Sequence, residues 1–246
     1  MRWGMLALIG FAVVGPLRAA DGPRAIVEKA IKAHGGEENL NKYQAAQVKG
    51  KGSMSDMGME ATFTLELYAQ SPNKVRSDLK FKVMGNTFEM SQVFDGKKAW
   101  SKAMGQVMEV EGDQLEDLKE EAYSNYLERI VPLIEDKNLK LEAAPEMKVE
   151  GKPALGVKVV SKGHKDTTMY FDKASGLLVM TKRKSKDSTG MEVDAESYLS
   201  NYKSFNGVKQ ATKVLVKHGD KKFIEAELID IKLLEKLDDK TFAKPE

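Results

Sequence analysis

An alternating stretch, MEATFTLELYA at residues 59–69, decides the fold class. Its odd-numbered positions are all apolar, whereas the even-numbered positions from Glu60 to Glu66 are polar. Side chains that alternate with a period of two residues point to opposite faces of a strand. The stretch therefore predicts a long β-strand with one buried face.

The same alternation continues on both sides of this strand. Residues 48–54, 75–83 and 88–94 have strand spacing, and Met84-Gly85-Asn86 and Asp95-Gly96 suit tight turns, the second leading into Ala99-Trp100. Further strand-like runs cover residues 155–159, 169–171, 177–181, 191–195, 211–216 and 223–231. Long strands with short connections indicate antiparallel meanders rather than alternating βαβ units.

Helical spacing is confined to three segments. Pro23 opens the first, which the glycines after His34 end, and the second is a short one at residues 37–43. Residues 113–133 carry an apolar stripe behind an acidic start, and Pro132 either kinks this helix or starts a last turn. We therefore expect the two meanders to form one sheet around a helix.

The chain begins with the pattern of a secretory leader. Arg2 precedes an apolar run at residues 3–14, and small residues follow at Ala19 and Ala20. The run is shorter than the roughly 20 residues that a membrane-spanning helix needs. We therefore predict a signal peptide at residues 1–20 and one domain at residues 21–246, with an uncleaved anchor as the alternative.

Composition excludes several classes of function. Loss of Arg2 and Arg18 with the leader leaves 37 basic against 37 acidic residues, so net charge gives no argument for nucleic acid as a partner. With no cysteine, the chain forms neither a disulfide nor a thiolate metal site. His34, His164 and His218 stand far apart, without the spacing of zinc ligands. We expect no metal, no cofactor and no nucleic acid.

No motif points to catalysis. Ser71-Pro72-Asn73-Lys74 is interpreted as a turn, since it lies between strands, and Gly50-Lys51-Gly52 lacks the third glycine of a phosphate loop. The acidic pairs at residues 116–117 and 120–121 are interpreted as solvated charges on a polar helix start, because acid/base catalysis needs a buried, perturbed carboxyl group. We expect the protein not to be an enzyme.

A basic cluster, Lys182-Arg183-Lys184 with Lys186, has two interpretations. It is either a contact surface for anionic headgroups or a partner, or a set of edge-strand lysines that prevents sheets from aggregating.

Short turn and strand-end motifs recur along most of the chain. They are Pro72-Asn73-Lys74-Val75-Arg76, then residues 94–100 (FDGKKAW) and 170–178 (YFDKASGLL), then residues 202–207 (YKSFNG) and 237–242 (LDDKTF) with Pro245. In order and spacing this series resembles the LolA/LolB-like family of periplasmic lipoprotein carriers and lipid-binding relatives. The resemblance implies a mainly β (α+β) fold: an unclosed antiparallel β-barrel of about ten or eleven strands, with helices packed over its concave face.

The resemblance also implies a function. The chain would be a periplasmic or otherwise exported soluble carrier or chaperone that binds a lipid, acyl chain or lipidated protein in an apolar cavity, without chemical turnover. We select the candidate lining by its apolar face: Phe63, Leu65, Leu67, Val75, Leu79, Phe81, Phe88, Met90 and Trp100. The alternative is an envelope sensor or protein-interaction module, with a filled barrel and lysine-rich strands that bind an envelope protein.

Overall fold

The computed structural model describes residues 22–56, 59–83, 85–187 and 189–246. The predicted signal peptide at residues 1–20 lies outside these residues. None of the helices in the described ranges is long and apolar enough to cross a bilayer.

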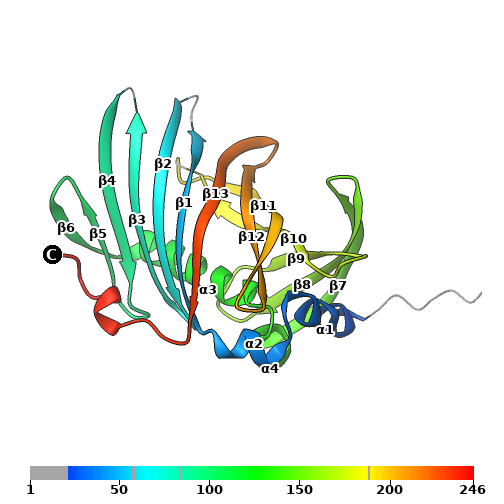
Figure 1. The fold of residues 1–246 in the computed structure, drawn as a ribbon. Coiled ribbons are helices and arrows are strands. Elements are labelled where there is room, and N and C mark those ends of the chain that lie inside the picture. The colour runs from blue at the N-terminus through cyan, green and yellow to red at the C-terminus, as the bar shows by residue number, and fades with distance from the viewer. Residues whose placement is uncertain (1–21, 57–58, 84, 188) are drawn as a thin grey trace, which may run out of the picture.

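The described residues form one antiparallel sheet of thirteen strands (Figure 1). Its order is β6-β5-β4-β3-β2-β1-β13-β12-β11-β10-β9-β8-β7. Consecutive strands are therefore paired, except β6 and β7, which form the two edges, and β1 pairs with β13. The strands are β1 (Ala45–Asp56), β2 (Met59–Gln70), β3 (Lys74–Val83), β4 (Asn86–Phe94), β5 (Ala99–Ala103), β6 (Gln106–Val110), β7 (Leu139–Val149), β8 (Lys152–Ser161), β9 (Thr167–Asp172), β10 (Leu178–Lys186), β11 (Glu192–Phe205), β12 (Val208–His218) and β13 (Lys221–Leu234). The predicted class, an unclosed antiparallel β architecture, is confirmed.

The predicted number of strands, ten or eleven, is wrong because the sequence pattern did not reveal β6 and β7. Both are edge strands, each with a single neighbour. Exposed edges are typically short, charged or interrupted by bulges, which removes the clean alternation that marks an inner strand. Strand β6 has only five residues. Strand β7 carries Pro145 at a register shift between Ala144 and Met147, a place where proline is tolerated in a sheet.

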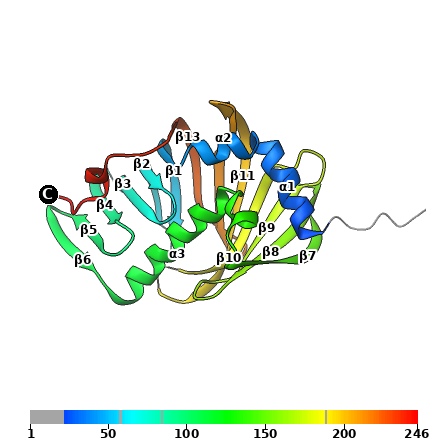
Figure 2. The same cartoon turned by 90° about the horizontal axis from the view of Figure 1, so that it is seen from below.

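The α-helices of the described residues are α1 (Pro23–His34), α2 (Glu37–Lys42), α3 (Gly112–Glu128) and α4 (Pro132–Glu135). Helix α3 lies inside the curve of the sheet, and α1, α2 and α4 lie at one end of it (Figure 1 and Figure 2). The helix predicted at residues 113–133 is therefore two helices: Ile130 has a φ of 70°, and Pro132 starts α4 at the first helical position. The largest core cluster joins Val27, Tyr123 and Leu127 of the helices to Val157 and Met169 of the sheet.

The C-terminal segment crosses the outer, convex face of the sheet (Figure 1). Its 3-10 helix η1 (Asp239–Phe242) seats Phe242, which is 2% exposed, against Val93 and Trp100. Lys74 of β3 pairs with Asp239 at 2.8 Å. These contacts fix which face of β2 to β5 points outward.

Candidate ligand-binding face

Two apolar rows cross strands β2, β3 and β4 on the concave face. The strand register aligns Phe63 with Phe81 and Phe81 with Phe88, and the next row is Leu65, Leu79 and Met90. Exposure rises across the first row, from 7% for Phe63 to 44% for Phe88. Side chains directly opposite one another on neighbouring strands lie about 5 Å apart at Cβ, so the six residues form a continuous surface.

Helix α3 covers the adjoining part of the concave face. Leu115, Leu118 and Ala122 pack in one cluster with Val75, Phe94, Ala99, Val110 and the half-buried Leu67. The predicted lining residues Leu67 and Val75 therefore lie beneath the helix as part of the core. The two rows lie outside this cluster, and Leu65, Leu79, Phe81 and Met90 are only half-buried.

Trp100, which the sequence interpretation placed with the lining residues, lies on the opposite face. It pairs with Val93, which alternates with the concave-face residue Phe94, and it packs against Phe242 of the C-terminal segment. Trp100 belongs to the core of the outer face. This correction leaves Leu65, Leu79, Phe81, Phe88 and Met90 as the open apolar surface, next to the buried Phe63 on β2.

Charged side chains also face the concavity. Glu121 and Glu128 lie seven residues apart on one side of α3, a side that packs in neither core cluster, and both side chains are exposed to water. Loss of solvation among surrounding protein atoms nevertheless raises the pKa of Glu121, and it raises the pKa of Glu128 to about 6. The positive charge of Arg183 in β10 lowers both pKa values and so partly offsets the increase. Both carboxyl groups therefore face the positive charge of Arg183 from α3.

The other acids of this helix are not free charges either. Glu120 accepts hydrogen bonds from the His164 ring and from the backbone N–H of Lys165, at 2.8 and 3.1 Å. Asp117 lies 3.6 Å from the ammonium group of Lys186. The interpretation of the acidic pairs as merely solvated is therefore wrong for Glu120, whereas Asp117 remains exposed. Polar periodicity alone does not reveal which acids meet a partner from another strand.

The basic cluster is largely neutralised within the sheet. Lys182 pairs with Glu196 at 3.1 Å, and Lys184 pairs with Asp194 at 3.2 Å. Their strand, β10, lies between β9 and β11, so these lysines do not protect a sheet edge. The edge-strand interpretation is wrong.

The histidines have structural contacts. Nδ1 of His34 lies 2.8 Å from the carbonyl oxygen of Ala30, and the backbone N–H of Leu178 points to Nε2 at 3.4 Å. This arrangement fits a neutral ring that donates through Nδ1 and accepts at Nε2. Burial lowers the pKa of His34. Within the described ranges, no group of three or more His, Asp or Glu side chains converges on a metal position.

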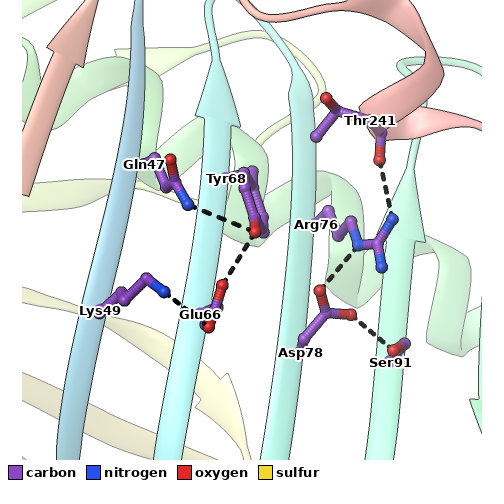
Figure 3. A network of polar contacts seen from close by, with 8 residues as sticks. All are labelled: Gln47, Lys49, Glu66, Tyr68, Arg76, Asp78, Ser91 and Thr241. Carbon is purple, nitrogen blue, oxygen red and sulfur yellow. Dashed lines mark hydrogen bonds and ion pairs between the residues drawn. The ribbon is translucent and has the colours of Figure 1, made fainter.

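The middle of the outer face carries a polar network in which both carboxylates are paired (Figure 3). Glu66 accepts hydrogen bonds from Lys49 and from the Tyr68 hydroxyl, at 3.0 and 2.9 Å. Asp78 accepts from Arg76 and Ser91, at 2.9 and 2.5 Å. Arg76 also reaches the backbone carbonyl of Thr241 in the C-terminal segment. Because these groups satisfy one another, the network fixes strands β1 to β4 and the C-terminal segment.

Taken together, the open antiparallel sheet, helix α3 inside its curve and the apolar concave surface define the class: a helix-filled half-barrel. No protein-family model matches the sequence, and the search of curated proteins found no match.

Solved structures share the fold at low sequence identity. A DUF1329 family protein from Desulfovibrio piger has a TM-score of 0.59 and 14% identity, over 91% of this chain and 98% of its own. A LolA superfamily protein from Nitrosomonas europaea has a TM-score of 0.59 and 11% identity, over 92% and 99% of the two chains. A putative outer membrane lipoprotein-sorting protein domain from Vibrio parahaemolyticus has a TM-score of 0.58 and 13% identity, over 91% of this chain and 96% of its own. The chain therefore has the LolA-type fold.

Proposed function

We propose that this protein is a carrier or chaperone that binds a lipid, an acyl chain or a lipidated protein segment on its concave face, without chemical turnover. The single observation that carries the proposal is the pair of apolar rows on β2 to β4, which α3 leaves uncovered. A contiguous open apolar surface marks a binding site more often than it marks an ordinary soluble face. The LolA-type fold supports the same function.

The energetics of burial are sufficient for this role. Each CH₂ group transferred from water contributes about 0.8 kcal/mol, so ten groups contribute about 8 kcal/mol. That value corresponds to a dissociation constant near 1 μM before the cost of ordering the chain is subtracted. One acyl chain of ordinary length therefore gives reversible binding, which a carrier requires.

Native mass spectrometry of residues 21–246, purified without detergent, tests the proposal together with uptake of a fluorescent fatty acid. We expect bound lipid in the purified protein or saturable uptake by the empty protein. Leu65→Asp and Phe81→Asp should reduce uptake at least tenfold, because each places a charge in the apolar rows. Thr64→Asp is the matched control, since Thr64 neighbours Leu65 on β2 but points to the outer face.

Uptake by folded Leu65→Asp and Phe81→Asp proteins at the wild-type level would contradict the proposed lining. An empty protein that also takes up no fatty acid would favour the envelope sensor or interaction module. Capture of an envelope protein that depends on Lys182, Arg183 and Lys184 would then support that alternative.

We propose export as part of the same function. The leader pattern at residues 1–20 supports cleavage that leaves Asp21 at or next to the mature N-terminus. N-terminal sequencing of the protein from the periplasmic fraction tests this, and an intact Met1 in a membrane fraction would contradict it.

A further inference from the structure

A hollow of about 850 Å³ lies on the outer face of the sheet, where its lining also includes Phe63 and Phe81 of the apolar rows. Its walls come from β1 to β4, from β11 to β13 and from Glu150 in the turn between β7 and β8. This volume falls in the range of small-molecule binding sites, about 300–1,000 Å³. The hollow crosses seven strands, or about 28 Å at the usual strand spacing, so it suits an elongated ligand.

The strand register places the side chains of this hollow. On β2, Thr62 and Thr64 flank Phe63, and on β3 Lys80 and Lys82 flank Phe81. Since Phe63 and Phe81 point to the concave face, their neighbours point outward. The thickness of the sheet therefore separates the hollow from the proposed lipid surface.

One row of outward side chains shows the chemistry of the hollow. From β3 to β11 it reads Lys80, Thr64, Lys51, Glu227, Lys213 and Ser200, each opposite the next on a neighbouring strand. Ammonium groups, hydroxyl groups and one carboxylate thus alternate about 5 Å apart. The second row adds the hydroxyls of Ser53, Thr62 and Thr87.

Several of these groups have no partner, unlike the paired carboxylates of the network in Figure 3. Lys80 pairs with Glu89 and Glu225 pairs with Lys222, at 2.8 and 3.0 Å. Among the residues that the structure describes, the ammonium groups of Lys51, Lys82 and Lys213 form no ion pair or hydrogen bond. The cations of the hollow therefore remain available to a ligand.

A polyhydroxylated ligand matches this mixture best. An ammonium group only donates hydrogen bonds and an ionised carboxylate only accepts them, whereas a hydroxyl group does both. A simple polyanion would meet Glu227 between Lys51 and Lys213, and a simple cation would meet the lysines on either side. A chain of sugar units satisfies both kinds of group, and the three unpaired lysines favour a chain that also carries acidic groups.

We propose that the outer hollow binds an acidic oligosaccharide, with Lys51, Lys82 and Lys213 on its acidic groups and the hydroxyl-bearing side chains and Glu227 on its sugar hydroxyls. This site is independent of the lipid surface. The protein would then hold an apolar ligand and a saccharide on opposite faces of one sheet.

Isothermal titration calorimetry with the protein from residue 21 onward tests the site, with hexagalacturonate as the probe. Maltohexaose has the hydroxyls without the charges, and inorganic polyphosphate has charges without sugar rings. We expect hexagalacturonate to bind at least tenfold more tightly than either.

The double variant Lys51→Met/Lys82→Met, which keeps the aliphatic stems, should weaken hexagalacturonate binding at least tenfold. Lys97→Met, an exposed lysine between β4 and β5, is the control and should bind as the wild type does.

A second variant tests the position without changing charge. Thr64→Trp should block the hollow and abolish hexagalacturonate binding while fatty-acid uptake on the other face continues, and circular dichroism checks its fold. The proposal is overturned if hexagalacturonate does not bind at millimolar concentration, if polyphosphate binds equally well, or if folded Thr64→Trp protein binds normally. Because Leu65 belongs to the apolar rows and does not line the hollow, Leu65→Asp should leave saccharide binding intact, and failure of one site is distinguishable from failure of the other.

Discussion

Gly52 allows β13 to approach β1 closely. A Cβ atom at this position would lie 2.2 Å from the carbonyl oxygen of Glu225 and 2.8 Å from the ring of Phe63. Gly52→Ala should therefore lower the free energy of unfolding by about 1–3 kcal/mol, the usual cost of overpacking. Gly50→Ala is the control, because its closest neighbour at 3.1 Å is the mobile end of Leu228. Urea unfolding measures both, and equal stability of Gly52→Ala and wild type would contradict this account.

Glu128 makes the stability of the fold depend on pH. Its pKa is about 6 in the folded protein against an ordinary value of 4.5, so the folded state binds more protons between those values. This carboxyl group therefore favours the folded state below about pH 4.5, and that contribution is lost as pH rises through 6. Burial lowers the pKa of His34, so the unfolded state binds more protons than the folded state as pH falls below 6.5. The free energy of unfolding that this ring contributes therefore rises with pH, opposite to the effect of Glu128.

Comparison with Glu128→Gln isolates the carboxyl group, because His34 is unchanged. The variant should gain stability relative to wild type as pH rises from 4.5 to 7, measured by urea unfolding at several pH values. A constant difference across this range would contradict the raised pKa.

Sequence alternation identified which side chains of the long strands point to the concave face. It gave the wrong face for a residue of the short strand β5. Alternation over the 12 residues of β2 and the 10 of β3 defines which side chains share a face. At β5 the visible pattern was only Ala99-Trp100, and both residues are buried, on opposite faces. Two apolar neighbours do not define the phase of a strand, so Trp100 was placed on the wrong side. The sequence drew attention to Glu121 and Arg183 but did not connect either with Glu128, because the electrostatic effect of Arg183 on both acids acts between elements far apart in sequence.

The C-terminal segment is an element whose role is structural. Phe242 is 2% exposed against Val93 and Trp100, so Phe242→Ala should destabilise the protein by about 3–5 kcal/mol. Phe88→Ala removes the same ring from a site that is 44% exposed and should cost much less. Chemical unfolding measures the difference. Fatty-acid uptake per folded molecule should survive in Phe242→Ala, and loss of uptake in folded protein would place this segment in the binding site.

At the level of elements, prediction was best in the middle of the sheet. Inner strands are paired on both sides and packed on at least one face, so their composition is constrained at every second position. The edge strands β6 and β7 lack that constraint, and neither was recognised. Helix α1 was recognised because its start signal Pro23 acts locally, through a fixed φ and a missing N–H group, whereas Pro132 left open a kink or a last turn and did not reveal α4 as a separate helix.

The whole molecule presents two chemically different surfaces on one sheet, and this arrangement predicts how its two ligands interact. Phe81 and Lys82 are neighbours in β3, yet one faces the apolar rows and the other the polar hollow. Phe63 and Phe81 belong to the apolar rows and also border the hollow, but the strand register points their side chains to the concave face, so we expect no side chain to contact both ligands. The dissociation constant for hexagalacturonate should agree within twofold between lipid-loaded and empty protein, and the stabilisation by the two ligands should add in thermal unfolding. A fivefold or larger difference corresponds to about 1 kcal/mol of coupling. Such a difference would show that binding on the concave face changes the curvature of the sheet, and that the two binding sites are energetically coupled.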